Sequence, residues 1–121
     1  MGQRAGTVLI ADQETCVLRI ADAILRRLDF KVLLAQSRQQ LLALCRSYSD
    51  AIHLAILDAP ALIKPELRDC LSRQFVGIRI LCMSGYAGGM EMPVTNFVRK
   101  PFTPAQLLQA VRTALGRTRT R

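Results

Sequence analysis

Four consecutive apolar residues, Leu54 to Leu57, lead directly into an acid, Asp58. A half-buried strand would alternate apolar and polar side chains, whereas this run shows no alternation. Such a run is typical of a strand that is buried on both faces of a parallel sheet. A carboxylate at the end of such a strand either caps a turn or belongs to a functional site. The ends of the other strands decide between these two interpretations.

Short apolar runs alternate with segments of helical periodicity along the whole chain. The runs that we expect to form strands are residues 7–11, 31–35, 53–58, 78–84 and 95–100. Helices are expected over 14–29, after the N-cap Ser37, over 65–75, and after the N-cap Thr103 with Pro at the next position. This alternation predicts right-handed βαβ units, and hence an α/β fold whose parallel sheet is covered on both faces.

Size and composition predict a single globular domain. The chain has 121 residues, of which 50% are hydrophobic and 21% are charged, so it can bury a core and is not disordered. We assign residues 1–116 to the domain and residues 117–121 to a basic tail or linker stub. No apolar stretch approaches the roughly 20 residues that span a bilayer, and the start does not resemble a signal peptide. We therefore expect a cytoplasmic protein with no membrane partner.

Charge and cysteine usage narrow the possible partners and cofactors. The chain has 17 Lys and Arg against 9 Asp and Glu, a net charge of +8, which could attract nucleic acid. The basic residues are spread along the chain, however, and no helix-turn-helix or other reader motif is present. Nucleic acid is therefore the least favoured partner. The four cysteines form no CxxC pair, so we expect reduced thiols rather than a metal cluster or disulfide framework.

Functional sites of parallel sheets lie beyond the carboxyl ends of the strands. The polar residues at these ends are Asp12, Gln13 and Glu14, then Asp58, Ser84 and Lys100. On its own, Asp12 also fits an N-cap of the first helix. Together, however, these groups suit phosphoryl chemistry, because an Asp beside bound Mg²⁺ can attack a phosphoryl group to give an aspartyl phosphate. Other oxygens would hold the metal, and a hydroxyl and a lysine would bind the phosphoryl oxygens.

These residues lie in four motifs, LIADQE (9–14), AILD (55–58), ILCMSGYA (80–87) and FVRKPF (97–102). With these motifs in this order, the sequence resembles the receiver domain of two-component response regulators over nearly its whole length. The motif MSGYA is most similar to receivers of hybrid sensor histidine kinases. The resemblance implies a flavodoxin-like, doubly wound five-stranded parallel sheet with strand order 2-1-3-4-5. It also implies Mg²⁺ as cofactor, a histidine kinase or phosphotransfer protein as partner, and an output protein or domain that the sequence does not name.

The resemblance further implies a role for each residue of the site. Asp58 would be the phosphoacceptor, Ser84 and Lys100 would contact the phosphoryl group, and Phe97 would be the switch aromatic. The implied metal ligands are Asp12, Asp58, Gln13 as a weak ligand, and the backbone carbonyl of Ala59. Pro101 would follow a cis peptide bond. Such a domain is a phosphoacceptor switch with at most slow autodephosphorylation, and it is not an enzyme with an outside substrate.

The sequence departs from the family pattern in three places. Gln13 stands where a second acid is usual, which should weaken Mg²⁺ binding unless Glu14 turns inward. The loop after Asp58 carries its proline at Pro60 rather than at Leu62, so its path should differ. The segment between Ser84 and Lys100 is short and rich in Gly, so we expect the fourth helix to be shortened or absent. Gln13 and the missing helix favour an alternative, a degenerate pseudo-receiver that binds proteins without being phosphorylated.

Overall fold

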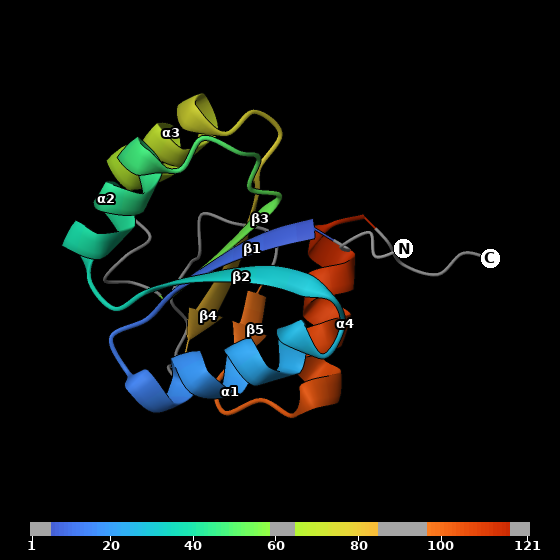
Figure 1. Ribbon diagram of the computed structural model, residues 1–121. Coiled ribbons are helices and arrows are strands. Elements are labelled where there is room, and N and C mark those ends of the chain that lie inside the picture. The colour runs from blue at the N-terminus through green and yellow to red at the C-terminus, as the bar shows by residue number, and fades with distance from the viewer. Residues whose placement is uncertain (1–5, 59–64, 85–96, 117–121) are drawn as a thin grey trace.

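The computed structural model describes residues 6–58, 65–84 and 97–116. One sheet contains the strands β1 (Gly6–Ala11), β2 (Phe30–Ala35), β3 (Leu54–Asp58), β4 (Arg79–Ser84) and β5 (Phe97–Arg99). The helices of the described residues are α1 (Thr15–Arg26), α2 (Arg38–Ser47), α3 (Pro65–Gln74) and α4 (Pro104–Ala114). Every neighbouring pair of strands is parallel, and the strand order is β2-β1-β3-β4-β5 (Figure 1). The predicted α/β class and strand order are therefore confirmed.

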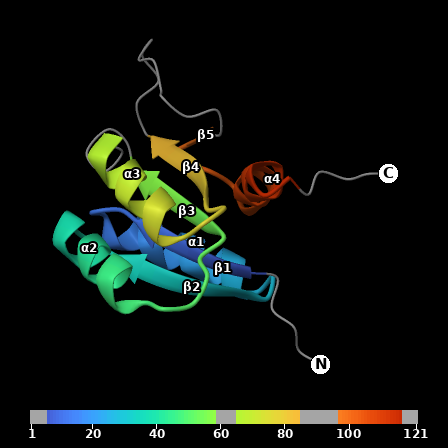
Figure 2. The ribbon, with the colours of Figure 1, turned by 90° about the horizontal axis from the view of Figure 1, so that it is seen from above.

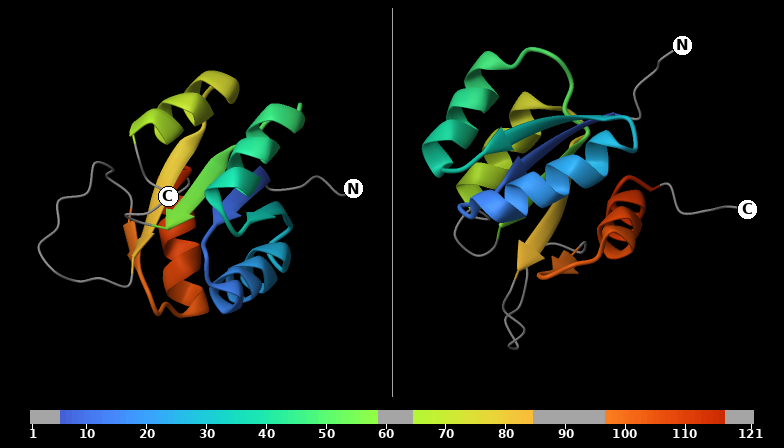
Figure 3. Two further views of the ribbon diagram at one scale, coloured as in Figure 1. Left: turned by 90° about the vertical axis from the view of Figure 1, so that its left-hand side faces the viewer. Right: turned by 60° about the horizontal axis from the view of Figure 1, so that its bottom comes forward.

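Two layers of helices cover the two faces of the sheet. Helices α1 and α4 lie on one face, and α2 and α3 lie on the other (Figures 1 and 3). The same layering appears in Figure 2, where β3 and β4 lie between α3 and α4. Each face has its own hydrophobic cluster, because successive side chains of a strand point to opposite sides. The core of this domain is therefore divided in two by the sheet.

Strand β3 contributes to both clusters. Leu54 and Ile56 pack in the cluster under α1 and α4, whereas Ala55 and Leu57 pack in the cluster under α2 and α3. All four are fully buried. This double burial is the physical reason for the uninterrupted apolar run that precedes Asp58.

Local sequence signals start two of the helices where they were expected. Ser37 Oγ accepts a hydrogen bond from the Gln40 backbone N–H (3.1 Å) at the start of α2. Thr103 and Gln106 form a reciprocal capping box at the start of α4, and Pro104 follows the cap. The predicted helix over 14–29 is too long, because α1 ends at Arg26 and a turn with Asp29 at a φ of 70° leads into β2.

Three predictions concern residues outside those that the structure describes. They are the shortened helix within residues 85–96, the altered loop at Pro60, and the basic tail at 117–121. Among the described residues, no helix has the length and apolar character needed to cross a bilayer.

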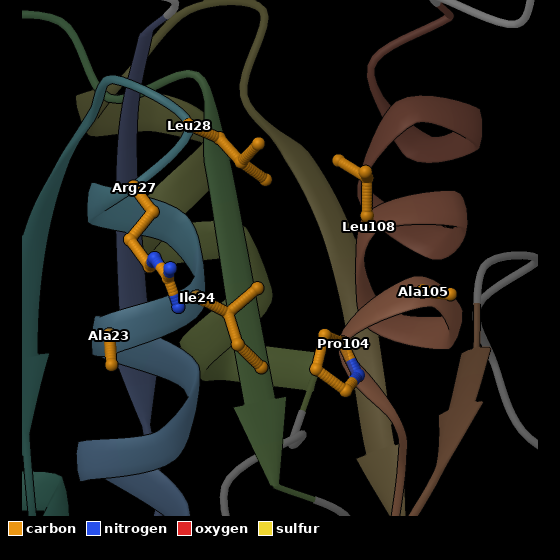
Figure 4. Close-up of a pocket in the computed structure, with 7 residues that line it drawn as sticks. All are labelled: Ala23, Ile24, Arg27, Leu28, Pro104, Ala105 and Leu108. Carbon is orange, nitrogen blue, oxygen red and sulfur yellow. The ribbon is translucent and has the colours of Figure 1, made fainter.

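A groove of about 280 Å³ separates the outer sides of α1 and α4. Ile24 of α1 and Leu28 of the turn after it point toward Pro104 and Leu108 of α4, and Arg27 is the charged residue of the groove lining (Figure 4). None of the acids or the lysine at the strand ends lines this groove. The groove is therefore separate from the charged residues at the carboxyl edge of the sheet.

Candidate functional site

Three strands end close together and carry charged groups. Asp12 follows β1 and Asp58 is the last residue of β3. Because Ala11 is in register with Leu57, the two acids occupy equivalent positions, each one residue beyond that pair. Lys100 directly follows Arg99, which is in register with Ser84 on β4. The register of the sheet thus brings both acids and the lysine to one edge.

The ammonium group of Lys100 lies between the carboxylates. Its Nζ donates to Asp12 Oδ2 at 3.0 Å, to Asp58 Oδ1 at 3.2 Å and to Glu14 Oε1 at 3.4 Å. The Asp12 side chain is fully buried, whereas 17% of the Asp58 side chain and 14% of the Lys100 side chain are exposed. Lys100 is therefore not a surface lysine, and one positive charge faces three negative charges.

Hydrogen bonds on both sides hold the loop after β1. Asp12 Oδ1 accepts the backbone N–H of Glu14 at 2.8 Å. Next along the chain, Thr15 Oγ1 accepts a hydrogen bond from Gln36 Nε2 in the loop after β2. The N-cap of α1 is Glu14, so the interpretation of Asp12 as the N-cap of this helix is wrong. Asp12 instead fixes the turn that precedes the helix.

Burial and neighbouring charges shift two pKa values in the pocket. Burial raises the pKa of Asp58, the Asp12 carboxylate raises it further, and the hydrogen bond from Lys100 offsets only part of the rise. Burial lowers the pKa of Lys100, but its hydrogen bonds to Asp12 and Asp58 outweigh this effect and leave that pKa raised. The lysine is therefore charged at neutral pH, while the negative charge of Asp58 destabilises the fold.

We expect the Asp58→Asn variant to be more stable than the unmodified protein at neutral pH and without divalent ions. The gain should be about 1 kcal/mol, as is common when a functional group is replaced by a neutral one. Because the pKa of Asp58 is raised on folding, the gain should grow as the pH rises above the ordinary Asp value of about 4. Urea unfolding in chelator at several pH values measures it. A variant that is less stable at neutral pH would contradict the direction of this pKa shift, and Asp50→Asn, at an exposed acid, is the control.

The structure brings three of the residues predicted from the strand ends together. Asp12, Asp58 and Lys100 meet as expected, and the Lys100-Pro101 peptide bond is cis, as the resemblance implies. For Ser84 and Phe97 the structure describes the backbone, which ends β4 and begins β5. Ala59 lies outside the described residues. The contact between Gln36 and Thr15 was not foreseen, since no local pattern connects residues so far apart in sequence.

The donor chemistry of the pocket fits Mg²⁺. Asp12 and Asp58 direct carboxylate oxygens at one cation, which in this structure is the ammonium group of Lys100. The described residues contain no group of three or more His, Cys, Asp or Glu side chains arranged to hold a metal ion. Two carboxylates are nevertheless sufficient, because Mg²⁺ in proteins often keeps water and phosphate oxygens as its other ligands.

Solved structures of known proteins show the same fold. A response regulator receiver protein from Sinorhizobium medicae is 26% identical, covers 93% of this chain and 95% of its own, and has a TM-score of 0.74. The receiver domain of the hybrid histidine kinase CckA is 26% identical over 91% of this chain and 99% of its own, with a TM-score of 0.75. A CheY-like receiver domain protein from Methanospirillum hungatei is 22% identical over 92% of this chain and 94% of its own, with a TM-score of 0.75. No family model matches the sequence, and a search of curated proteins finds no significant match.

The strand order, with acids and a lysine at the carboxyl edge of the sheet, defines a receiver-type domain, the class used in two-component signalling. Within that class, the chain is similar to a response regulator receiver protein and to the receiver domain of a hybrid histidine kinase.

Proposed function

We propose that this domain is a phosphoacceptor switch, in which Asp58 takes a phosphoryl group from a partner histidine kinase or phosphotransfer protein. The observation that carries the proposal is the surroundings of Asp58. It is a partly exposed acid at the end of a buried strand, and it shares the partly buried Lys100 with Asp12. A nucleophile, a second acid and a cation thus lie within one network of hydrogen bonds.

In the proposed reaction an Asp58 oxygen attacks the phosphorus atom, and the imidazole of the donor leaves with its bonding electrons. Lys100 would neutralise the charge on the transferred oxygens. Asp12 and Asp58 would hold Mg²⁺, with the Gln13 amide and the Ala59 carbonyl as further ligands. When bound, the ion would draw negative charge from the phosphoryl group. Ser84 would hydrogen-bond a phosphoryl oxygen, and Phe97 would change position between the two states.

The resulting acyl phosphate would alter the surface near β5 and so its contact with an output partner. Its hydrolysis by the domain itself would be slow, so the domain acts as a switch rather than as an enzyme with an outside substrate. A cytoplasmic location, where a kinase can reach it, belongs to the same proposal.

The test is to incubate the protein with Mg²⁺ and a small-molecule phosphodonor and then to measure its intact mass. We expect the mass of one phosphoryl group to be added, in an acid-stable and base-labile form. The Asp58→Asn variant should stay unmodified, whereas Asp50→Asn, at an exposed acid, should react like the unmodified protein. If the unmodified protein takes up no phosphoryl group even at high Mg²⁺, the proposal is wrong.

The second candidate is a pseudo-receiver that binds a protein partner without phosphorylation. The exposed amide of Gln13 favours it, and so does the Lys100 ammonium group between the two carboxylates. In that case no adduct would form, and Asp58→Asn would bind the partner as tightly as the unmodified protein does.

A further inference from the structure

We infer that Glu14, rather than residue 13, supplies the second acidic charge after β1 and thereby raises the affinity of the domain for Mg²⁺. The inference rests on the proposed function, because it takes Mg²⁺ as the ion of this pocket. It assigns to Glu14 a role in positioning a cation through its charge, a role that the family pattern gives to the acid usual at position 13.

The first support is the direction of the two neighbouring side chains. Glu14 and Gln13 are both exposed residues, but Glu14 Oε1 lies 3.4 Å from the ammonium group of Lys100. The Glu14 backbone is held beside the pocket, because its N–H is bound by the buried carboxylate of Asp12 at 2.8 Å. The hydrogen bond between Gln36 and Thr15 holds the chain immediately after it. The loop therefore keeps the backbone of Glu14 next to the pocket, with its carboxylate within reach of Lys100.

The second support is electrostatic. Lys100 marks the place where Asp12, Asp58 and Glu14 together stabilise a positive charge. A divalent ion at the same carboxylates would be attracted by all three. Since 63% of the Glu14 side chain is exposed, it would act through solvent and its contribution would be screened by salt. Its removal should therefore lower Mg²⁺ affinity by roughly three- to tenfold at low ionic strength.

The experiment is a Mg²⁺ titration followed by the amide NMR shifts of residues 12–14 and 58, at low and at high salt. We compare the unmodified protein with Glu14→Gln, Gln13→Ala and the control Asp50→Asn. Glu14→Gln should bind Mg²⁺ roughly three- to tenfold more weakly at low salt, and this difference should shrink at about 1 M salt. Asp50→Asn should stay within about twofold of the unmodified protein, because it removes no charge near the pocket. Gln13→Ala removes a weak ligand but no charge, so it should weaken binding less than Glu14→Gln does.

The outcomes separate this inference from the proposed function. If Asp58→Asn abolishes binding but Glu14→Gln does not weaken it, the role of Glu14 is wrong and the function stands. The role of Glu14 is also wrong if Gln13→Ala weakens binding more than Glu14→Gln does. If the unmodified protein shows no shifts with Mg²⁺ and takes no phosphoryl group, the proposed function itself fails. Unchanged spectra of Glu14→Gln without Mg²⁺ would show that the fold is intact.

Discussion

The Lys100→Met variant is expected to lose about 3 kcal/mol of its free energy of unfolding when no divalent ion is present. Methionine keeps the length and the apolar stem of the lysine but removes the ammonium group. Asp12, which is fully buried, and Asp58 would then face each other as like charges without a counter-ion. Urea unfolding at neutral pH in chelator measures the loss. A variant as stable as the unmodified protein would show that the carboxylates do not need the ammonium group.

Added Mg²⁺ should restore much of that stability, because a bound ion can take the place of the ammonium group and stabilises the folded state that binds it. The unmodified protein should respond less, since its pocket already contains a cation. Lys31→Met is the matched control: it removes an ammonium group 5.0 Å from the centre of the Tyr48 ring. It should cost less than about 1 kcal/mol and should show no added response to Mg²⁺.

The Leu25→Ala variant is expected to unfold about 3 kcal/mol more easily than the unmodified protein. Leu25 is fully buried in α1 and belongs to the cluster between α1, α4 and the sheet, so the truncation leaves a cavity. Ile20→Ala is the control on the same helix, because Ile20 is 52% exposed, and it should change stability by less than about 0.5 kcal/mol. Denaturant unfolding of both variants makes the comparison. Equal losses would mean that α1 packs on the sheet by a different face.

The sequence was sufficient to predict the sheet and the meeting of Asp12, Asp58 and Lys100. Strands that alternate with helices become parallel, and parallel strands place their carboxyl ends at one edge. Residues far apart in the chain are then brought together by topology alone, whatever their side chains do. The register of Ala11 with Leu57 and of Ser84 with Arg99 aligns the ends of these strands at that edge.

The direction of Glu14 could not be predicted in the same way. The backbone of Glu14 is held by the hydrogen bond from its own N–H to Asp12, and the chain beside it is held by Gln36, which lies in another loop. Neither contact leaves a periodic signal in the sequence. The length of α1 was overestimated for a related reason. Leu28 continues the apolar period and packs against the same cluster, but it does so from the turn that follows the helix.

The two sides of the pocket differ in how firmly they are held. Asp58 ends a strand that has neighbouring strands on both sides and buried side chains on both faces. Lys100 follows the three-residue strand β5 at the edge of the sheet, and Val98 of this strand packs in the core cluster. The β5 side of the pocket should therefore move more easily than the β3 side. A charge added at Asp58 should displace the backbone of β5 further than that of β3.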